Sequence, residues 1–271
     1  MQVTGSVRSI PGFSLLAILC LVILYAPLLV VMVYSFNDSL SITIWGGFSL
    51  RWYEQIFFGL EAEKFQKAAW NSITIAFMAA VIATTIAFSA AIGVVRTSPF
   101  KGKNLNISLL SLPIMVPEIV TAVATLIFFS MISFKLGYTS ILVAHIVFCI
   151  PFAYLPISAR MQSIEKVYEE AAMDLYANRK QIFRSILLPL MIPGIISGFL
   201  LAFIISLDDF IITSFVKGAG VETLPTAIFG SIKQGIKPDI MALSTLLLLV
   251  STIFVTISYF LSRADLKNRL N

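Results

Sequence analysis

The chain has 271 residues, of which 58% are hydrophobic and 12% charged, and its mean hydropathy is +0.94. A soluble domain of this length carries roughly twice that charged fraction, so the composition predicts an integral membrane protein. The net charge of +5 is no sign of nucleic-acid binding, because the sequence has neither a glycine-rich phosphate loop nor a basic patch with stacked aromatic residues.

Six apolar runs each reach the ~20 residues that a bilayer-spanning helix needs. They cover residues 13–35, 68–95, 106–134, 139–158, 188–215 and 241–262. The first run is too long for a signal peptide and lacks a small-residue cleavage site, so we expect it to be retained. We therefore predict an all-α integral membrane protein in which residues 1–271 form one transmembrane domain of six helices.

The distribution of basic residues predicts the orientation of these helices. Six spans place both termini on one side, and the segments on that side contain twelve of the 19 Lys and Arg residues. Because cytoplasmic loops are enriched in Lys and Arg, we expect both termini and the loop 159–187 in the cytoplasm. The loops 36–67 and 216–240 are then outside.

Two segments between the spans have patterns of their own. The loop 36–67 is long enough for short interfacial helices, and its Trp52 and Tyr53 are either part of an interfacial aromatic belt or contacts for a cation or its methylene chain. The segment 158–189 carries charges of both signs with apolar residues at helical spacing, which predicts two short amphipathic helices. Such helices lie on lipid or dock a cytoplasmic partner.

The residues that most often bind metals are few. His145 is the only histidine, and no metal-ligating partners cluster near it in the sequence, so we expect it to serve helix packing or a hydrogen bond. Cys20 and Cys149 both fall within predicted spans, where a disulfide is not expected. We predict no metal site.

A family resemblance enters at EAAMDLYANRKQIFRSILLP, residues 170–189. This stretch resembles the EAA loop of ABC-importer permeases, which in that family is the coupling helix that sits in a cleft of the cytoplasmic ATPase. The matching residues, to which the resemblance assigns ATPase coupling, are Glu170, Ala171, Ala172, Ile186, Leu188 and Pro189. Small alanines permit close approach, the glutamate offers a carboxylate to basic groups, and Pro189 marks the entry to the next span. One position departs: Tyr176 stands where the family has a glycine, and a turn that needs positive φ would be strained by tyrosine.

The resemblance extends over most of the chain. It is carried by YAPLLVVMVYSFN (25–37), GFSLRWYEQIF (47–57), HIVFCIPFAY (145–154), EEAAMDL (169–175), LDDFIITSFVKG (207–218) and TLPTAIFGSIKQGIKPDI (223–240). Together these segments are similar to the C-type permease subunit of bacterial spermidine/putrescine importers; Met241 departs, where relatives have Asn. The resemblance implies the type I ABC importer fold, an inner-membrane location and a transport function without enzymatic activity. It also implies a second permease subunit, two cytoplasmic ATPases and a periplasmic polyamine-binding protein. The chain has no Walker A pattern, so ATP and Mg²⁺ would be bound by the ATPase and no cofactor by this chain.

The stretch SLDDFIITSF, residues 206–215, places two adjacent aspartates in an apolar run, where a carboxylate at mid-bilayer costs about 2.5–3.5 kcal/mol. No Lys or Arg lies within any predicted span, so these carboxylates have no such partner in the chain. An acidic path suits a polycation, whose ammonium groups need compensating anions once their water is removed. The candidate path residues are Asp208, Asp209, Glu118, Ser206 and Trp52. Adjacent residues on a helix point about 100° apart, so at most one aspartate squarely faces a path.

Other interpretations remain open from the sequence. The aspartates could be hydrated residues at a helix end, and Glu118 could accept hydrogen bonds where Pro113 and Pro117 open the backbone. The chain could import another cation or ferric iron, act as an ion-coupled secondary carrier, or serve as an assembly subunit without a path of its own. The spacing of the EAA-like segment argues against the carrier.

Overall fold

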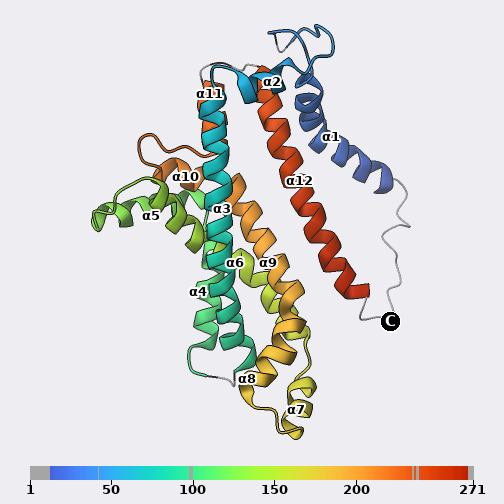
Figure 1. The fold of residues 1–271 in the computed structure, drawn as a ribbon, viewed down its shortest axis with the longest axis vertical. Helices are drawn as coiled ribbons and strands as arrows, with labels where there is room; N and C mark the ends of the chain where they lie inside the picture. The colour runs from blue at the N-terminus through green and yellow to red at the C-terminus, as the bar shows by residue number, and fades with distance from the viewer. Residues whose placement is uncertain (1–12, 42, 98–99, 234, 236–237, 268–271) are drawn as a thin grey trace. The chain divides into compact units, whose positions relative to one another are not determined.

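The computed structural model describes residues 13–267, except 42, 98–99, 234 and 236–237 (Figure 1). Within these residues the secondary structure is helical apart from one isolated β-bridge between Asn37 and Phe48. Among the described residues, five helices are long and apolar enough to cross a membrane, and a bent pair makes a sixth if it is counted as one span. The prediction of an all-α membrane protein is confirmed.

The chain divides into two compact units, one of residues 1–63 with 230–248 and the other of residues 64–229 with 249–271. In the first unit, α1 (Phe13–Tyr34) is apolar on all sides, and no residue of its most apolar stretch is buried. Such a helix is suited to facing lipid. Helix α2 (Arg51–Phe58) is one of the short helices expected in the loop 36–67. Helices α11 (Leu224–Lys233), which the sequence analysis did not anticipate, and α12 (Pro238–Lys267) each contribute residues to both units.

In the second unit, the longest helices pack through small residues. Helix α3 (Ala62–Ala91) buries a row of alanines and continues into a π-helical turn, η2 (Ile92–Arg96). Helix α6 (Tyr138–Ser163) packs against α9 (Leu188–Asp208). Two glycines of α9 permit this contact, because a Cβ at Gly194 would lie 2.5 Å from the Arg160 side chain and one at Gly198 2.8 Å from the Ala153 carbonyl.

The predicted third span, 106–134, is two helices rather than one. Helices α4 (Lys103–Met115) and α5 (Glu118–Met131) meet at an angle of 106°. Val116 has extended dihedral angles, φ −85° and ψ 135°, which is the conformation that a following proline imposes. Pro117 therefore breaks the span and leaves Glu118 at the start of α5.

The predicted fifth span, 188–215, begins earlier and is interrupted near its end. Helix α8 (Arg179–Ile182) runs through a second π-helical turn, η3 (Phe183–Leu187), directly into α9, which ends at Asp208. Pro189 therefore lies inside a continuous helical segment, and the wider π turn before it accommodates the proline ring. After Asp209, whose backbone is extended, the short helix α10 (Ile211–Val216) follows.

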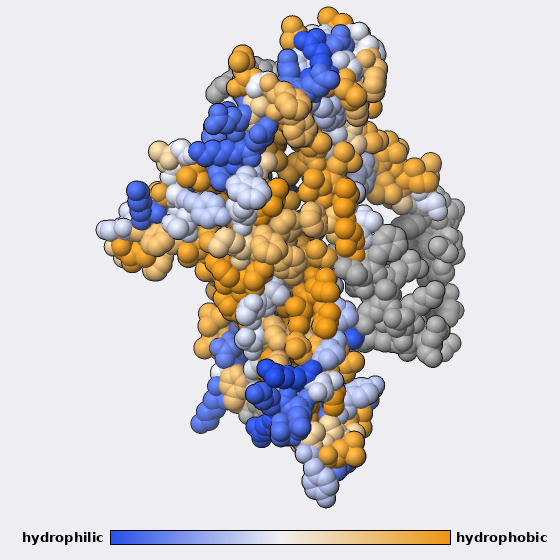
Figure 2. Space-filling view, viewed as in Figure 1, coloured by the Kyte–Doolittle hydropathy of each residue, from blue (hydrophilic) through white to orange (hydrophobic). Residues whose placement is uncertain are grey.

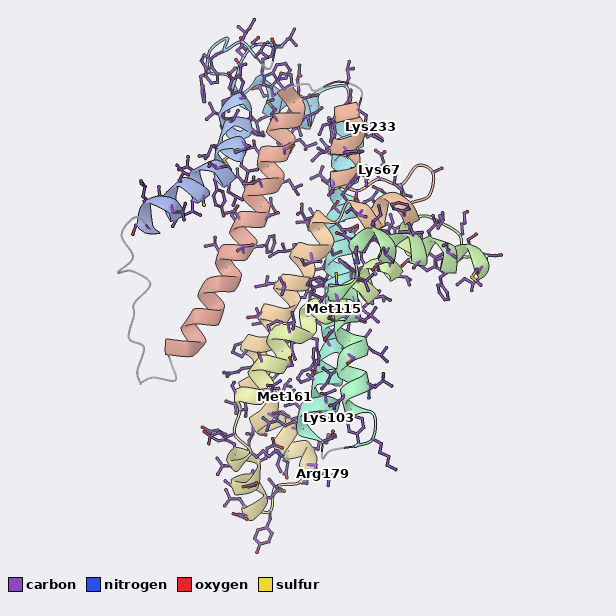
Figure 3. All side chains as sticks on the ribbon, turned by 180° about the vertical axis from the view of Figure 1, so that it is seen from behind. Lys67, Lys103, Met115, Met161, Arg179 and Lys233 are labelled. Carbon is purple, nitrogen blue, oxygen red and sulfur yellow. The ribbon has the colours of Figure 1, made fainter. Side chains whose placement is uncertain are left out.

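The two breaks lie beside a common apolar core in the second unit. This core consists of Ile75, Ala122, Phe129, Ile141, Ala144, Phe148, Ile212 and Val216, from α3, α5, α6 and α10. Figure 2 shows hydrophobic side chains over the middle of this unit and hydrophilic ones at the end that holds α7 (Val167–Asp174) and α8. In Figure 3, Lys103 and Arg179 lie toward that end, whereas Lys67 lies toward the opposite one. Both ends of the helices thus carry basic residues, as expected for membrane-spanning segments.

Candidate functional site

The two helix breaks bring three carboxyl groups together. Asp208 is the last residue of α9, Asp209 lies between α9 and α10, and Glu118 begins α5. The Glu118 side chain lies close enough to interact with both aspartates, and most closely with Asp209. The structure therefore brings together the three acidic residues that are candidates for the substrate path, although Glu118 lies 90 residues before Asp208 in the sequence.

Asp209 is buried, with 5% of its surface exposed, and its carboxylate caps α10. It accepts hydrogen bonds from the backbone N–H groups of Ile212 (3.3 Å) and Thr213 (2.8 Å) and from the Thr213 hydroxyl (2.7 Å). These are the donors that a helix leaves without partners in its first turn. Asp209 is thus bound to the protein on several sides.

His145 completes this hydrogen-bond cluster from α6. Its side chain is almost fully buried, with Nε2 3.1 Å from Asp209 Oδ2 and 2.9 Å from Thr213 Oγ1. Its Nδ1 lies 2.7 Å from the Ser206 hydroxyl. An imidazole protonated on Nε2 donates to Asp209 and accepts from Ser206, which satisfies both ring nitrogens. The hydrogen-bonding role predicted for His145 is confirmed.

This arrangement explains how a carboxylate is tolerated in an apolar run. Burying a polar or charged group is strongly unfavourable unless its hydrogen bonds are satisfied, and the Asp209 carboxylate is within hydrogen-bond distance of four donor groups from three residues. From the sequence, only Lys and Arg were expected as partners for the aspartates, whereas the partner in the structure is His145, which lies 64 residues before Asp209. His145 is the only histidine of the chain, and this was the one feature of the sequence that could have drawn attention to it. That feature does not indicate which residue His145 contacts.

The candidate residues differ in how accessible they are. Asp208 is exposed and Glu118 half-buried, whereas Asp209 and Ser206 are buried. The adjacent aspartates thus point to different surroundings, as expected from the 100° between neighbours on a helix. Exposed carboxylates can pair with ammonium groups, while Asp209 and Ser206 hold the helix break in shape. Among the described residues, no group of three or more His, Cys, Asp or Glu residues is arranged to hold a metal ion.

Trp52 belongs to the first unit and is 3% exposed. Its indole N–H donates to the Asn37 carbonyl, and the Arg51 guanidinium carbon lies 4.5 Å from its ring centroid. Asn37 in turn accepts a hydrogen bond from Gly46 N–H (2.7 Å) and donates to the Ile44 carbonyl (2.8 Å). These contacts make Trp52 an anchor for the folded loop before α2; a role in a substrate path stays a prediction.

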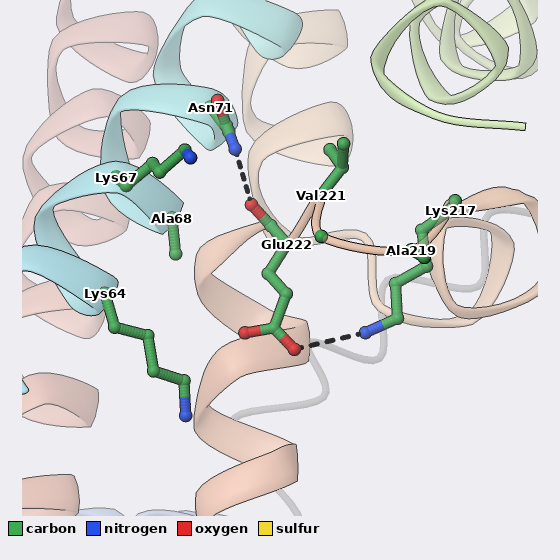
Figure 4. A pocket seen from close by; sticks show the side chains of 10 residues that line it. Lys64, Lys67, Ala68, Asn71, Lys217, Ala219, Val221 and Glu222 are labelled. Atoms are coloured by element: carbon green, nitrogen blue, oxygen red, sulfur yellow. Dashed lines mark hydrogen bonds and ion pairs between the residues drawn. The ribbon is translucent and has the colours of Figure 1, made fainter.

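A second feature is a basic pocket of about 380 Å³ in the second unit (Figure 4). It is lined by Lys64 and Lys67 from α3 and by Lys217, with Glu222 3.4 Å from the Lys217 ammonium group. Three ammonium groups against one carboxylate repel a cation and attract an anion. This pocket is therefore unsuited to a polycationic substrate, in contrast to the carboxyl group cluster of Glu118, Asp208 and Asp209.

The segment that resembles the EAA loop forms α7, a turn and α8. Glu170 and Ala171 are exposed, and Ala172 is buried. Of the other matching residues, Ile186 and Leu188 are half-buried and Pro189 is exposed. Glu170 and Ala171 are therefore accessible on the surface of α7, while the buried Ala172 packs α7 against the rest of the segment.

Tyr176 occupies the left-handed region, with φ +60°, and 97% of its surface is exposed. The Tyr176 N–H binds the Met173 carbonyl (2.9 Å), and the Ala177 N–H binds the Ala172 carbonyl (3.0 Å). This is the Schellman arrangement, in which the residue at the Tyr176 position is usually glycine. The turn thus needs the positive φ for which glycine is suited, and tyrosine there costs about 1 kcal/mol or more.

Replacing Tyr176 with glycine is expected to stabilise the turn between α7 and α8, because glycine adopts positive φ without steric conflict. Since the Tyr176 ring is exposed, little packing is lost. We expect an equal or higher thermal unfolding temperature for the purified protein and equal or higher transport activity. A clear loss of transport at unchanged stability would show that the tyrosine ring itself contacts a partner.

Residues 99–267 match the family described as the binding-protein-dependent transport system inner membrane component. The chain belongs to this family.

Curated relatives resemble this permease over nearly its whole length. It is 37% identical to the putrescine transport system permease protein PotI of Escherichia coli K12, across 97% of this chain and 95% of PotI. It is 39% identical to the spermidine/putrescine transport system permease protein PotC of Haemophilus influenzae, across 89% of this chain and 93% of PotC. PotC of Escherichia coli K12 is 35% identical across 90% of this chain and 91% of the relative.

Solved structures confirm the fold predicted for the permease. A bacterial ABC transporter involved in the import of the acidic polysaccharide alginate superposes with a TM-score of 0.64 and 16% identity, over 94% of this chain and 96% of that one. The inward-facing MetNI methionine ABC transporter superposes with a TM-score of 0.63 and 17% identity, over 74% and 95% of the two chains. The chain is therefore a multi-pass membrane permease with the type I ABC importer fold, and a transport subunit rather than an enzyme.

Proposed function

We propose that this permease is a membrane-spanning subunit of an ATP-driven importer that carries putrescine or spermidine into the cytoplasm. The observation that carries the proposal is the 35–39% identity to PotI and PotC across at least 89% of the chain. The names of those relatives specify putrescine or spermidine/putrescine transport.

The carboxyl group cluster supports a cationic substrate. Asp208 is exposed and Glu118 half-buried, so both can approach a polyamine, whereas Asp209 is bound to His145 and Thr213. Ammonium groups that lose water in a membrane protein need anionic or aromatic partners. We assign Asp208 the leading role in compensating substrate charge and Glu118 a supporting one. Asp209 and Ser206 hold the break between α9 and α10.

The family description, which names a binding-protein-dependent system, supports a proposal for the partners. We propose that a second permease subunit completes the path, that two cytoplasmic ATPases bind ATP and Mg²⁺, and that a binding protein delivers the polyamine. The ATPase contact is assigned to α7, where Glu170 and Ala171 are exposed. The protein would lie in the bacterial inner membrane, among its lipids.

We further propose that both termini and the α7–α8 segment lie in the cytoplasm, on the basis of the Lys and Arg distribution. Single cysteines at the highly exposed positions Tyr176 and Leu60, in a chain without Cys20 and Cys149, test this orientation. A membrane-impermeant thiol reagent added to intact cells should label position 60 and leave position 176 unlabelled. The reverse pattern would invert the topology.

The function is tested by reconstituting the permease with its partner permease, ATPase and binding protein in liposomes. We expect uptake of radiolabelled putrescine or spermidine. Uptake should require ATP on the side of the membrane that holds the ATPase, and the binding protein on the opposite side. Uptake driven by a proton or sodium gradient without ATP would support a secondary carrier instead. ATP-driven uptake of ferric iron but not of polyamines would keep the importer class and overturn the substrate.

A further inference from the structure

One side chain, Arg96, joins the end of α3, the end of α6 and the start of α7. This arginine is the last residue of η2, the π-helical turn that ends α3, and only 9% of its side chain is exposed. One guanidinium nitrogen, Nη2, donates to the carbonyls of Met161 (3.1 Å) and Ile164 (2.9 Å). The other, Nη1, lies 3.1 Å from Glu169 Oε1.

The partners of Arg96 belong to two further helices. Met161 lies in the last turn of α6 and Ile164 is its C-terminal cap residue, so both carbonyls belong to the helix end, where the regular backbone hydrogen bonds of the helix stop. The Met161 carbonyl also accepts a long hydrogen bond from the Ile164 N–H, at 3.4 Å. A positive charge there also complements the helix dipole. Glu169 lies in the first turn of α7. Arg96 therefore connects the ends of α3 and α6 to the start of α7.

This connection differs from an ordinary surface ion pair. Exposed pairs contribute little because water and salt screen them, but here the arginine is nearly buried and Glu169 is 27% exposed. The contact to Glu169 is an ion pair without an aligned hydrogen bond, whereas the two carbonyl contacts are hydrogen bonds. The planar, forked guanidinium can serve both partners at once, which the single ammonium group of lysine cannot do as well.

We infer that Arg96 is a positioning residue that holds α7 in fixed orientation to the membrane-spanning helices α3 and α6, so that movement of α7 is transmitted to them. The transport consequence rests on the proposed function, in which α7 binds the ATPase. Helix α7 packs otherwise on α8 and η3, which continue into α9. Arg96 supplies the polar connection from α7 to α3. In the sequence, Arg96 is only one of the basic residues whose distribution predicts the orientation of the helices.

The first experiment measures the structural part without any transport assay. Hydrogen exchange of residues 164–176 is compared in the purified permease and in Arg96→Met, which keeps an unbranched, flexible side chain in place of the arginine stem and removes the guanidinium with its charge and donors. We expect exchange of α7 amides to rise at least tenfold in Arg96→Met, with α9 amides unchanged. Lys101→Met, which removes an exposed positive charge five residues later, is the matched control and should leave α7 exchange as in the parent.

The second experiment measures coupling in the reconstituted importer as polyamine taken up per ATP hydrolysed. Arg96→Met should lower this ratio at least fivefold while the ATPase stays bound and active, and Arg96→Lys should recover part of it. Glu169→Gln keeps both carbonyl hydrogen bonds and should cause a smaller loss. Because the two residues share one contact, the double variant should be no worse than Arg96→Met alone.

The outcomes separate this inference from the proposed function. If the parent complex shows no ATP-driven polyamine uptake, the proposed function fails, and the exchange experiment still decides whether Arg96 positions α7. If the parent transports and Arg96→Met shows the parent's coupling ratio, the inference is overturned. Loss of the ATPase from the complex, or equal exchange in Arg96→Met and the parent, would also overturn it. Should Arg96→Met fail to accumulate, Glu169→Gln carries the test alone, and a parental coupling ratio in that variant would contradict the role of the ion pair.

Discussion

Replacing Asp208 with asparagine is expected to lower polyamine uptake at least tenfold while leaving the amount of protein in the membrane unchanged. The side chain is exposed at the end of α9, so the substitution removes charge without disturbing the buried hydrogen bonds. Removing one member of a charge pair costs about 2–5 kcal/mol in binding interfaces, and a wetter path favours the lower end. The loss should be greater for spermidine than for putrescine, because spermidine carries one more positive charge.

Two further variants define what the Asp208 result means. Asp38→Asn is the matched control, since Asp38 is also exposed and its contact with Arg51, at 3.5 Å, is a surface pair of small energetic value. It should transport like the parent. Asp209→Asn should instead destabilise the protein by about 1–3 kcal/mol, because His145 and Thr213 lose a charged acceptor. Parental uptake by Asp208→Asn, with either polyamine, would remove Asp208 from the path.

Reversing the charge of Glu170 is expected to abolish most ATP-driven uptake. In Glu170→Lys the exposed carboxylate of α7 becomes an ammonium group, which would repel the basic groups of the ATPase that the EAA resemblance implies. A like-charge contact at an interface costs several kcal/mol, so we expect uptake below about one tenth of the parent value. The permease should still reach the membrane, because the Glu170 side chain is exposed.

The measurement for Glu170→Lys is uptake together with ATP hydrolysis in proteoliposomes. Glu165→Lys makes the same charge change at an exposed residue before α7 and should leave both rates close to those of the parent. Undiminished ATP-driven uptake by Glu170→Lys would show that this face of α7 is not the ATPase contact. Together with Arg96→Met, the variant separates contact with the ATPase from transmission into the membrane helices.

Much of the architecture could be predicted because membrane insertion depends on local composition. A run of about 20 apolar residues is long enough to span a bilayer whatever surrounds it, which is why the apolar helices could be located from the sequence. The structure has five such helices among the described residues, or six if the bent pair α4 and α5 is counted as one span. The interruptions were harder to predict. Pro117 sits within a long apolar run, and hydropathy does not register that the residue before a proline favours an extended backbone. The break at Asp209 depends on His145 of α6 and Thr213 of α10, whose side chains donate hydrogen bonds to its carboxylate.

The EAA-like segment, too, could be predicted only in part from the sequence. Its residues marked the likeness to importer permeases, and the departure at Tyr176 pointed to a strained turn if the backbone required positive φ. The structure supplies that φ of +60° together with the two backbone hydrogen bonds of the turn. The sequence of the segment did not predict how α7 is attached to α3 and α6. Glu169 was one of several acidic residues, and nothing in the local pattern linked it to Arg96.

By itself, the sequence determined that this is a helical membrane permease with an EAA-like segment and unusual carboxylates in an apolar run. Those properties belong to single segments, whose composition and spacing are preserved in any arrangement of the helices. Only the tertiary structure decided that Asp209 is buried against His145, that Asp208 remains exposed, and that Arg96 joins α3 and α6 to α7. His145 and Asp209 lie 64 residues apart, and Arg96 and Ile164 lie 68 apart. Contacts at such separations depend on the rotation of each helix about its axis and on where its breaks fall, and both are set by the packing of the other helices.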